Sequence, residues 1–178
     1  EWLKGYSKKN VKINLKYGEN PNQEAHILRN SKKTIFDYQI SGKKISYNNI
    51  LDVDSGYKCL SEYKDPTCVI IKHTNPCGVA SSKRLILAYR KALNSDTESA
   101  FGGIVLFNRS VNYLLAKEIY KTFFEIIVAT KFDKQSKEIL KKKKNLILLE
   151  IKDLNIETLN IKSTIFGNIF QKNSKEQY

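Results

Sequence analysis

The amino-acid sequence predicts an α/β fold, a three-layer sandwich built on a mostly parallel sheet. Short apolar runs, each typical of a strand buried on both faces, occur at Cys68–Ile71, Ile104–Phe107, Glu125–Ala129 and Leu146–Leu149. Segments with helical spacing separate these runs, and strand–helix–strand units favour parallel pairing with right-handed crossovers. A length of 178 residues suits one domain, or one domain with a small appendage.

The first third of the chain predicts short strands joined by polar turns, followed by a helix. Strands are expected at Val11–Tyr17, Glu24–Leu28 and Thr34–Ile40. Breaker residues indicate turns at Gly18–Gln23 and Gly42–Lys44. Asp52 is expected to cap a helix that continues to about Tyr63, because its carboxylate can accept from the free N–H groups of a first turn.

The stretch Cys68–Ala80, CVIIKHTNPCGVA, carries a candidate site. A buried strand leads directly into Lys72 and His73. Thr74–Gly78 then predicts a shaped turn, because proline removes a donor and glycine allows positive φ. Ligands in open α/β sheets collect at the carboxyl ends of strands, so a cation and an imidazole would stand where chemistry is done. Taken alone, a carbonyl-bonded histidine and a solvated lysine are the simpler explanation of the pair.

The rest of the chain continues the alternation. Helices are expected from Ser81 or Ser82 to Asn94, over Val111–Lys121 and from Asp133 to Lys142, with a polar loop at Ser95–Glu98. Gly102 and Gly103 either let the backbone approach a ligand closely or allow a tight turn. The C-terminal segment, with Ile161 and Ile165–Phe170, is expected to add one or two edge strands before a polar end at Gln171–Tyr178.

The charge balance raises the question of nucleic-acid binding. The chain has 31 basic and 18 acidic residues, a net charge of +13. Nearly all of the basic residues are lysines spread along the whole chain, and lysine lacks the bidentate fork that suits phosphate and base recognition. A basic nucleic-acid-binding module therefore remains an alternative that requires the lysines to gather on one face.

Other protein classes have weaker support in the sequence. The chain has no apolar run of membrane-spanning length, and its N-terminus has no signal-peptide core. Its three cysteines lack CxxC or paired metal spacing and are expected to be reduced thiols in a cytoplasmic protein. The sequence also lacks a P-loop, a GxGxxG or GxSxG motif and a metal-ligand cluster.

Several of these stretches resemble, in order, the transformylase domain of the bifunctional purine biosynthesis family, which carries AICAR transformylase and IMP cyclohydrolase activities. The matching segments are LKYGENPNQ (Leu15–Gln23), ISYNNILD (Ile45–Asp52), KHTNPCGVA (Lys72–Ala80), SAFGGIVLFNR (Ser99–Arg109), FFEIIVA (Phe123–Ala129) and KKKNLILLE (Lys142–Glu150). Ordered matches over most of the chain are far more specific than a single motif. The resemblance implies a cytidine-deaminase-like α/β arrangement without a metal.

The resemblance also implies an activity for the Lys–His pair. The family's transformylase moves a formyl group from 10-formyltetrahydrofolate to the 5-amino group of AICAR, an aminoimidazole carboxamide ribonucleotide. That amine is a weak nucleophile, so a base must take its proton and a cation must support the developing charge. By this match His73 would be the proton acceptor and Lys72 the cation.

The same match implies substrate-binding residues. Lys16 and Tyr17 would meet the phosphate and base of the nucleotide, and Asn49, Gly102 and Glu125 would lie against its ribose or imidazole ring. Position 16 is lysine where the family usually has arginine, so a bidentate phosphate contact is lost.

The family's organisation implies partners as well. Its members are homodimers with shared active sites, so AICAR, a folate and a second copy are the expected partners, with no nucleic acid and no membrane. Residues 1–178 correspond to the first lobe of the transformylase domain, without the cyclohydrolase domain or the second lobe. The isolated lobe is expected to turn over poorly. The alternative within this resemblance is a non-catalytic relative that only binds the nucleotide.

Overall fold

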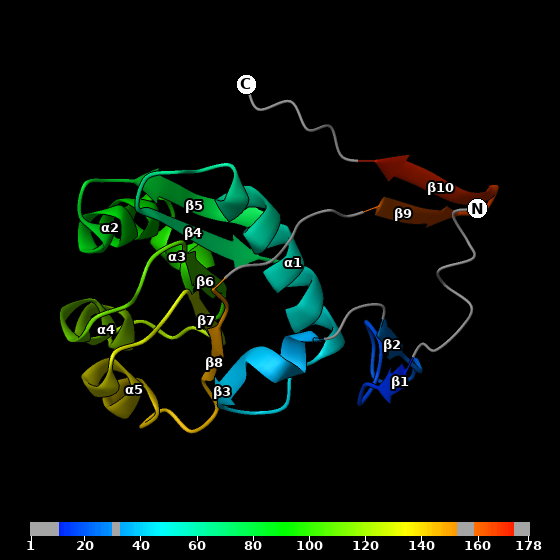
Figure 1. Ribbon diagram of the computed structural model, residues 1–178, viewed down its shortest axis with the longest axis horizontal. Helices are drawn as coiled ribbons and strands as arrows, with labels where there is room; N and C mark the ends of the chain where they lie inside the picture. The colour runs from blue at the N-terminus through cyan, green and yellow to red at the C-terminus, as the bar shows by residue number, and fades with distance from the viewer. Residues whose placement is uncertain (1–10, 30–32, 153–158, 173–178) are drawn as a thin grey trace.

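A computed structural model describes residues 11–29, 33–152 and 159–172 and has at its centre a six-stranded sheet of order β3-β8-β7-β6-β4-β5 (Figure 1). Its strands are β3 (Gln39–Ser41), β4 (Thr67–Lys72), β5 (Asn75–Ser81), β6 (Ile104–Phe107), β7 (Ile126–Ala129) and β8 (Ile147–Glu150). The helices are α1 (Tyr47–Ser61), α2 (Leu85–Ser95), α3 (Thr97–Ala100), α4 (Tyr113–Tyr120) and α5 (Lys134–Leu140), with a 3₁₀ turn η1 (Ile35–Tyr38).

The α/β class is confirmed, and the helices lie on both faces of the sheet. Figure 1 shows α2, α4 and α5 on one face and α1 on the other. Alternate residues of the buried strands enter the two cores: Ile70 packs in the core that contains Tyr89 of α2, and Ile71 in the core that contains Val53 of α1. Because each face of β4 enters a core, consecutive residues of this strand are apolar and do not alternate with polar ones.

The expectation of a mostly parallel sheet is wrong. Strand β6 pairs in parallel with β7, and β7 with β8, but β3–β8, β4–β6 and β4–β5 are antiparallel. The error arises at Thr74–Gly78, which we expected to be a shaped turn. Asn75–Ser81 is instead the edge strand β5, which follows β4 through a two-residue turn and needs no crossover helix. Pro76 is accommodated because β5 is an edge strand with a register shift near it.

The helix that carries part of the candidate site begins earlier than expected. Ser46, not Asp52, caps α1: its side chain accepts from the Asn49 N–H, and the Asn49 side chain accepts from the Ser46 N–H, each at 3.2 Å. This reciprocal pair is a capping box, so the helix starts at Tyr47 and Asp52 lies inside it.

Three other expectations need correction, because local contacts outweigh sequence propensity, and a fourth is confirmed. Thr34–Ile40 is mainly the 3₁₀ turn η1, in which Thr34 and Asp37 exchange capping hydrogen bonds. Helix α2 begins after Arg84, because Ser81 still belongs to β5. The Ser95–Glu98 loop contains the start of α3, capped by Asp96. The predicted Asp133 cap of α5 is confirmed.

Two small hairpins lie outside the central sheet. Strand β1 (Val11–Asn14) pairs with β2 (His26–Arg29), and β9 (Leu159–Thr164) pairs with β10 (Gly167–Lys172). The C-terminal strands therefore form their own sheet and are not edge strands of the central one. The predicted polar end, from residue 173 onward, lies outside the described residues. Within the ranges that the structure describes, no helix is long and apolar enough to span a membrane.

Close packing of α2 on the β4–β5 hairpin depends on Gly78. A Cβ atom at this position would lie 2.1 Å from the backbone oxygen of Ala92, a contact that only backbone movement can relieve. We expect Gly78→Ala to lower the free energy of unfolding by about 1–3 kcal/mol, the usual cost of overpacking a well-packed interface. Chemical denaturation measures this directly. The control is Lys91→Ala on the exposed face of α2, expected to change stability by less than about 0.5 kcal/mol.

Candidate active site at the end of strand β4

One pocket of about 500 Å³ collects every site residue that the sequence predicted. It is lined by Lys16, Tyr17, Lys43, Lys44, Ile45, Ser46, Asn48, Asn49, Asp52, Lys72, His73, Gly102, Ile104 and Glu125. The seven predicted residues come from five segments of the chain that are far apart in sequence. The structure thus brings the predicted set together, and it adds Lys43, Lys44 and Asp52, which sequence reasoning had not assigned to the site.

The pocket lies where strands of opposite direction meet. Strand β4 runs antiparallel to β6, so its carboxyl end, at Lys72, lies beside the amino ends of β6 and β7. Glu125 directly precedes β7, and Gly102 lies two residues before β6. Lys72 and His73 lie at the carboxyl end of their strand, where ligands collect in open α/β sheets, but Gly102 and Glu125 reach the same pocket from the amino ends of their strands.

His73 lies on a strained turn between β4 and β5. His73 and Thr74 have φ angles of 52° and 62°, in the left-handed region that residues other than glycine rarely adopt. The His73 carbonyl accepts hydrogen bonds from the Thr74 hydroxyl at 2.7 Å and from the Asn75 amide at 2.9 Å. The ammonium group of the preceding residue, Lys72, donates a hydrogen bond to the Phe101 carbonyl at 2.9 Å. The Lys–His pair is thereby held at the pocket wall.

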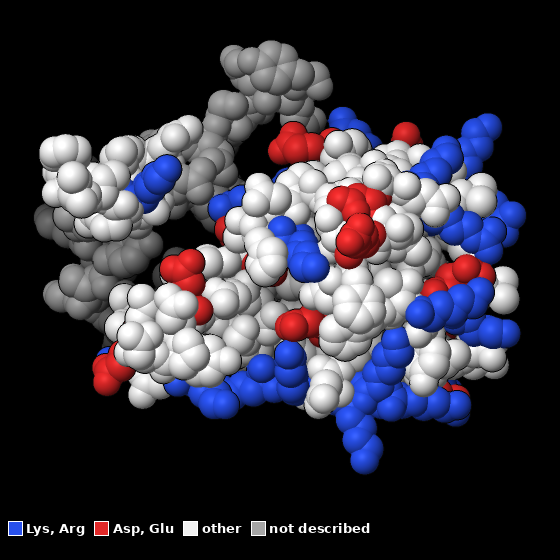
Figure 2. Space-filling model, turned by 180° about the vertical axis from the view of Figure 1, so that it is seen from behind, with Lys and Arg blue, Asp and Glu red and all other residues white. Residues whose placement is uncertain are grey.

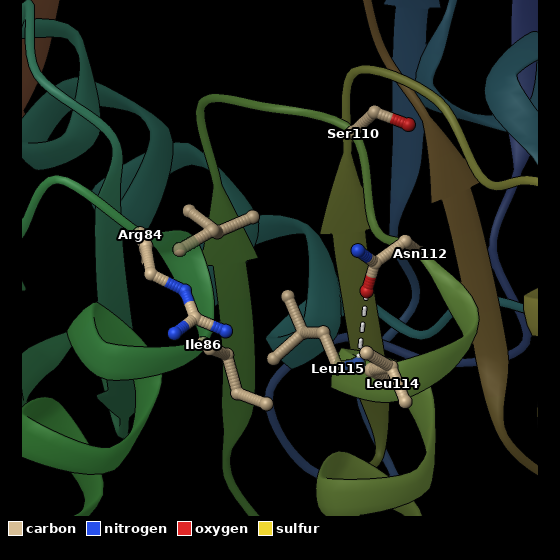
Figure 3. Close-up of a pocket in the computed structure, with 7 residues that line it drawn as sticks. Arg84, Ile86, Ser110, Asn112, Leu114 and Leu115 are labelled. Carbon is tan, nitrogen blue, oxygen red and sulfur yellow. Dashed lines mark hydrogen bonds between the residues drawn. The ribbon is translucent and has the colours of Figure 1, made fainter.

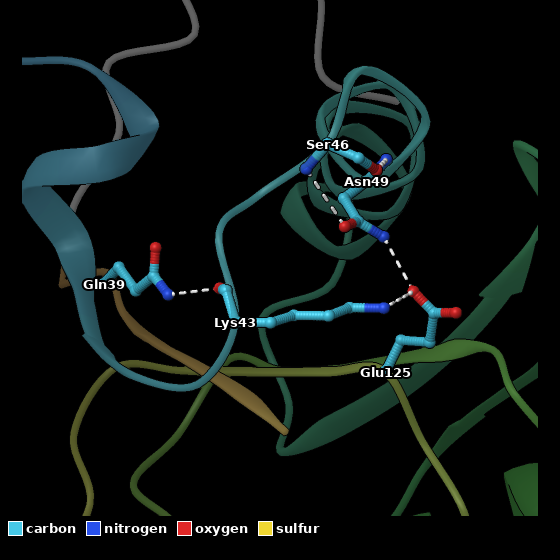
Figure 4. Close-up of polar contacts among 5 residues, drawn as sticks. All are labelled: Gln39, Lys43, Ser46, Asn49 and Glu125. Carbon is cyan, nitrogen blue, oxygen red and sulfur yellow. Dashed lines mark hydrogen bonds and ion pairs between the residues drawn. The ribbon is translucent and has the colours of Figure 1, made fainter. Parts of the chain in front are cut away.

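Glu125 is oriented by two donors from separate segments (Figure 4). Its Oε2 accepts from Asn49 Nδ2 at 3.1 Å and from Lys43 Nζ at 3.2 Å. Asn49 is fixed by the capping box of α1. The backbone carbonyl of Lys43 accepts from Gln39 Nε2 at 2.7 Å, which holds the loop that carries this lysine. The sequence predicted only a turn at Gly42–Lys44. The one sequence feature that could have indicated a site here is the pair of adjacent lysines, Lys43 and Lys44, in that turn.

Gly102 allows the tight turn that starts β6. Its φ of 76° is in the left-handed region, and its N–H donates to the Phe123 carbonyl at 2.8 Å. A Cβ on the next residue, Gly103, would lie 2.7 Å from the Ile71 carbonyl oxygen. Of the two roles considered for these glycines, the tight turn is present, and it brings the backbone of Gly102 to the pocket.

Lys16 and Tyr17 enter the pocket from the loop after β1. The turn that follows them is closed by Gly18 N–H to Gln23 carbonyl, at 2.7 Å. The Asn48 side chain, in the first turn of α1, donates to the Glu19 carbonyl at 3.3 Å and connects this loop to the helix. Lys16 Nζ lies 5.6 Å from the centre of the Tyr17 ring, within range of a cation–π contact.

The pocket has an excess of positive charge. Four lysines (Lys16, Lys43, Lys44 and Lys72) line it against two carboxylates, Asp52 and Glu125. The amino end of α1, the positive end of the helix dipole, also faces it through Ser46, Asn48 and Asn49. These features suit an anionic ligand. Among residues 11–29, 33–152 and 159–172, no group of three or more His, Cys, Asp or Glu side chains could hold a metal ion.

A second hollow, of about 250 Å³, contains none of the predicted residues (Figure 3). It is lined by Arg84, Leu85, Ile86, Ser110, Asn112, Leu114 and Leu115, at the amino ends of α2 and α4. Its Asn112 side chain is already used, because Asn112 Oδ1 accepts from the Leu115 N–H at 3.0 Å and caps α4. This hollow is therefore a weaker candidate than the pocket at β4.

An α/β sandwich with an imidazole, a paired carboxylate and four lysines around one pocket has the features of a site for a small anionic molecule. A family model described as "AICARFT/IMPCHase bienzyme" matches residues 4–178. This chain belongs to that family.

Curated relatives agree with this assignment. The chain is 43% identical over 170 residues to "Bifunctional purine biosynthesis protein PurH" of Caldicellulosiruptor saccharolyticus, covering 91% of this chain and 33% of the relative. Proteins of the same name from Petrotoga mobilis and Persephonella marina are 41% and 46% identical, over 90% and 81% of this chain and 32% and 29% of their own. The chain thus spans about a third of the length of the curated relatives it matches.

Asp52 gives the site a testable pH dependence. Burial raises the pKa of its carboxyl above the ordinary value of 3.8, while the Thr74 N–H and the charge of His73 oppose the rise. The folded protein therefore binds this proton more tightly than the unfolded chain. The resulting stabilisation is complete below pH 3.8 and is lost as the pH rises through the folded pKa.

We therefore expect Asp52→Asn, which cannot ionise, to gain stability relative to the parent chain as the pH rises from about 3 to 6. Urea denaturation at each pH measures the difference in the free energy of unfolding. Asp54→Asn, on an exposed position of the same helix, is the matched control. A difference between Asp52→Asn and the parent that stays constant or shrinks over this range would contradict the expectation.

Proposed function

We propose that this chain is the first lobe of an AICAR transformylase domain, and that its parent enzyme transfers a formyl group from 10-formyltetrahydrofolate to the 5-amino group of AICAR in purine biosynthesis. The parent would also be an IMP cyclohydrolase, although no residue assigned here performs that reaction. The observation that carries this proposal is the convergence of the seven predicted residues on a single lysine-rich pocket in a member of this bifunctional family.

In the proposed reaction, the amine nitrogen of AICAR forms a bond to the formyl carbon, and the bond from that carbon to the folate nitrogen breaks. His73 takes the proton that the amine loses as this bond forms. Lys72 supports the negative charge that develops on the formyl oxygen or on the leaving folate nitrogen. The proton that His73 took is then given to that nitrogen, which leaves as a neutral amine. Their adjacent positions at the end of β4 support these roles.

The polar wall of the pocket supports the proposed contacts with the nucleotide. Lys16 would meet the phosphate and Tyr17 the base, and Lys43 and Lys44 add positive charge nearby. Because Lys43 and Asn49 both donate to Oε2 of Glu125, its other oxygen can accept a hydroxyl or N–H of the ribose or imidazole ring. Asn49 and Gly102 would complete this contact.

The wider family features are part of the same proposal. We expect a cytoplasmic homodimer with shared active sites, since members of the family are assembled in this way. We also expect a cytidine-deaminase-like lobe, for which a mixed sheet between helical layers is a suitable framework.

A non-catalytic nucleotide-binding relative is the second candidate, because Lys16 offers a weaker phosphate contact than arginine. The intact pair Lys72–His73 argues against it. The nucleic-acid-binding alternative needs a face that is basic throughout. Figure 2 shows acidic side chains interspersed among the basic ones on the face it displays. A steep dependence of DNA retention on salt would favour that alternative.

Calorimetric titration with AICAR tests the proposed site. We expect saturable one-site binding that weakens at least about tenfold in a Lys72→Ala/His73→Ala variant, because a cation and a hydrogen-bonding ring are removed from the pocket. Lys91→Ala, on the exposed face of α2, is the control and should bind like the parent chain. Absence of binding, or equal affinity in the double variant, would contradict the site assignment.

Lys16→Arg tests the phosphate contact separately. Arginine presents two parallel donors to a phosphate, so we expect affinity for AICAR to rise about three- to tenfold. Affinity for the corresponding nucleoside, which lacks the phosphate, should not change. Equal gains for both ligands, or no gain for either, would show that Lys16 does not contact the phosphate. The same calorimetric titration measures both affinities.

A further inference from the structure

We propose that Asp52 and Ser55, two side chains of α1, are positioning residues that hold the β4–β5 turn in the conformation that presents His73 to the pocket. The catalytic importance of this device rests on the proposed function, since it assumes that His73 accepts the proton. The device itself follows from contacts that involve no ligand.

The two side chains hold both backbone groups of one turn residue. Asp52 Oδ1 accepts from the Thr74 N–H at 2.7 Å, and the Ser55 hydroxyl donates to the Thr74 carbonyl at 2.6 Å. Residues three apart lie on the same side of a helix, so Asp52 and Ser55 reach the turn together. Helix α1 therefore binds the turn at two points, one donor and one acceptor.

The turn needs such an anchor. Two-residue hairpin turns with positive φ at both positions favour Asn-Gly, because these residues tolerate the left-handed region. Here the positions are His73 and Thr74, and a β-branched residue with φ of 62° is strained. Hydrogen bonds from α1 compensate for this strain and select one conformation of the turn. The direction of the His73 side chain follows from that conformation.

Asp52 also places a negative charge next to His73, the residue proposed to become a cation when it accepts the proton. Its carboxylate interacts favourably with His73 and unfavourably with Glu125, the acid that precedes β7 and that Lys43 pairs with. In the proposed reaction His73 gains a proton, and Asp52 supplies a charge of the opposite sign beside the turn. A carboxylate kept in a partly buried position at a cost to stability, beside a strained turn, is a combination that clusters at active sites.

Nuclear magnetic resonance of the 178-residue chain tests the anchor without a ligand. The chain has two histidines, so with labelled histidine His73 reports on the turn, and His26 of β2 is an internal reference. Amide exchange of Thr74 reports on the hydrogen bond to Asp52. The variants are Asp52→Ala, which removes acceptor and charge, Asp52→Asn, which keeps an acceptor, and Ser55→Ala. The control is Asp54→Ala on the same helix.

We expect Thr74 exchange to accelerate at least about tenfold in Asp52→Ala, with a shift or broadening of the His73 ring signal and no change at His26. Asp52→Asn should restore most of the protection. Ser55→Ala should move the His73 signal in the same direction, and Asp54→Ala should leave it unchanged. Unchanged Thr74 exchange in Asp52→Ala, or a His73 signal indifferent to both Asp52→Ala and Ser55→Ala, would overturn the proposal.

The AICAR titration separates this proposal from the proposed function. If Thr74 and His73 respond as expected but AICAR does not bind, the anchor stands and the function assigned to the pocket fails. If AICAR binds through Lys72 and His73 but Thr74 does not respond, the function stands and the anchor fails. Ser55→Ala, which removes the second contact with Thr74, keeps the test decisive even if Asp52→Ala does not fold.

Discussion

The antiparallel position of β4 between β5 and β6 is the constraint on which the site depends. It brings the carboxyl end of β4 beside the amino ends of β6 and β7, so Lys72, Gly102 and Glu125 meet at one edge of the sheet. A parallel β4 would place Lys72 at the opposite edge from Glu125. The hairpin therefore determines the site as much as the residues do.

Costs to stability are concentrated near this hairpin. His73 and Thr74 have left-handed backbone conformations, and Asp52 is a carboxylate with reduced hydration next to them. Two rigid elements offset these costs: α1, which begins at a capping box, and β4, which is buried on both faces. Unfavourable local geometry that is held by well-packed surroundings is common where a side chain must be presented in one orientation.

The lysine-rich composition has two different meanings in this protein. Most lysines are exposed and scattered, and many of the ion pairs they form, such as Lys58–Asp54, are at the surface and contribute little to stability. The four lysines at the pocket instead act together, opposed by only two carboxylates. Lys43 has a specific contact, because it shares Glu125 with Asn49. A net charge could not distinguish these two groups.

The sequence by itself determined the buried strands and the Asp133 cap, and it predicted seven of the residues that line the pocket, because apolar runs, capping residues and ordered motifs are local signals. Only the tertiary structure decided the direction of β4 relative to β6, the strand at Asn75–Ser81 and the contributions of Lys43, Asp52 and Ser55. Their roles depend on partners between 19 and 82 residues away in the chain. Local patterns do not record such contacts, because pairing and packing between distant segments create them.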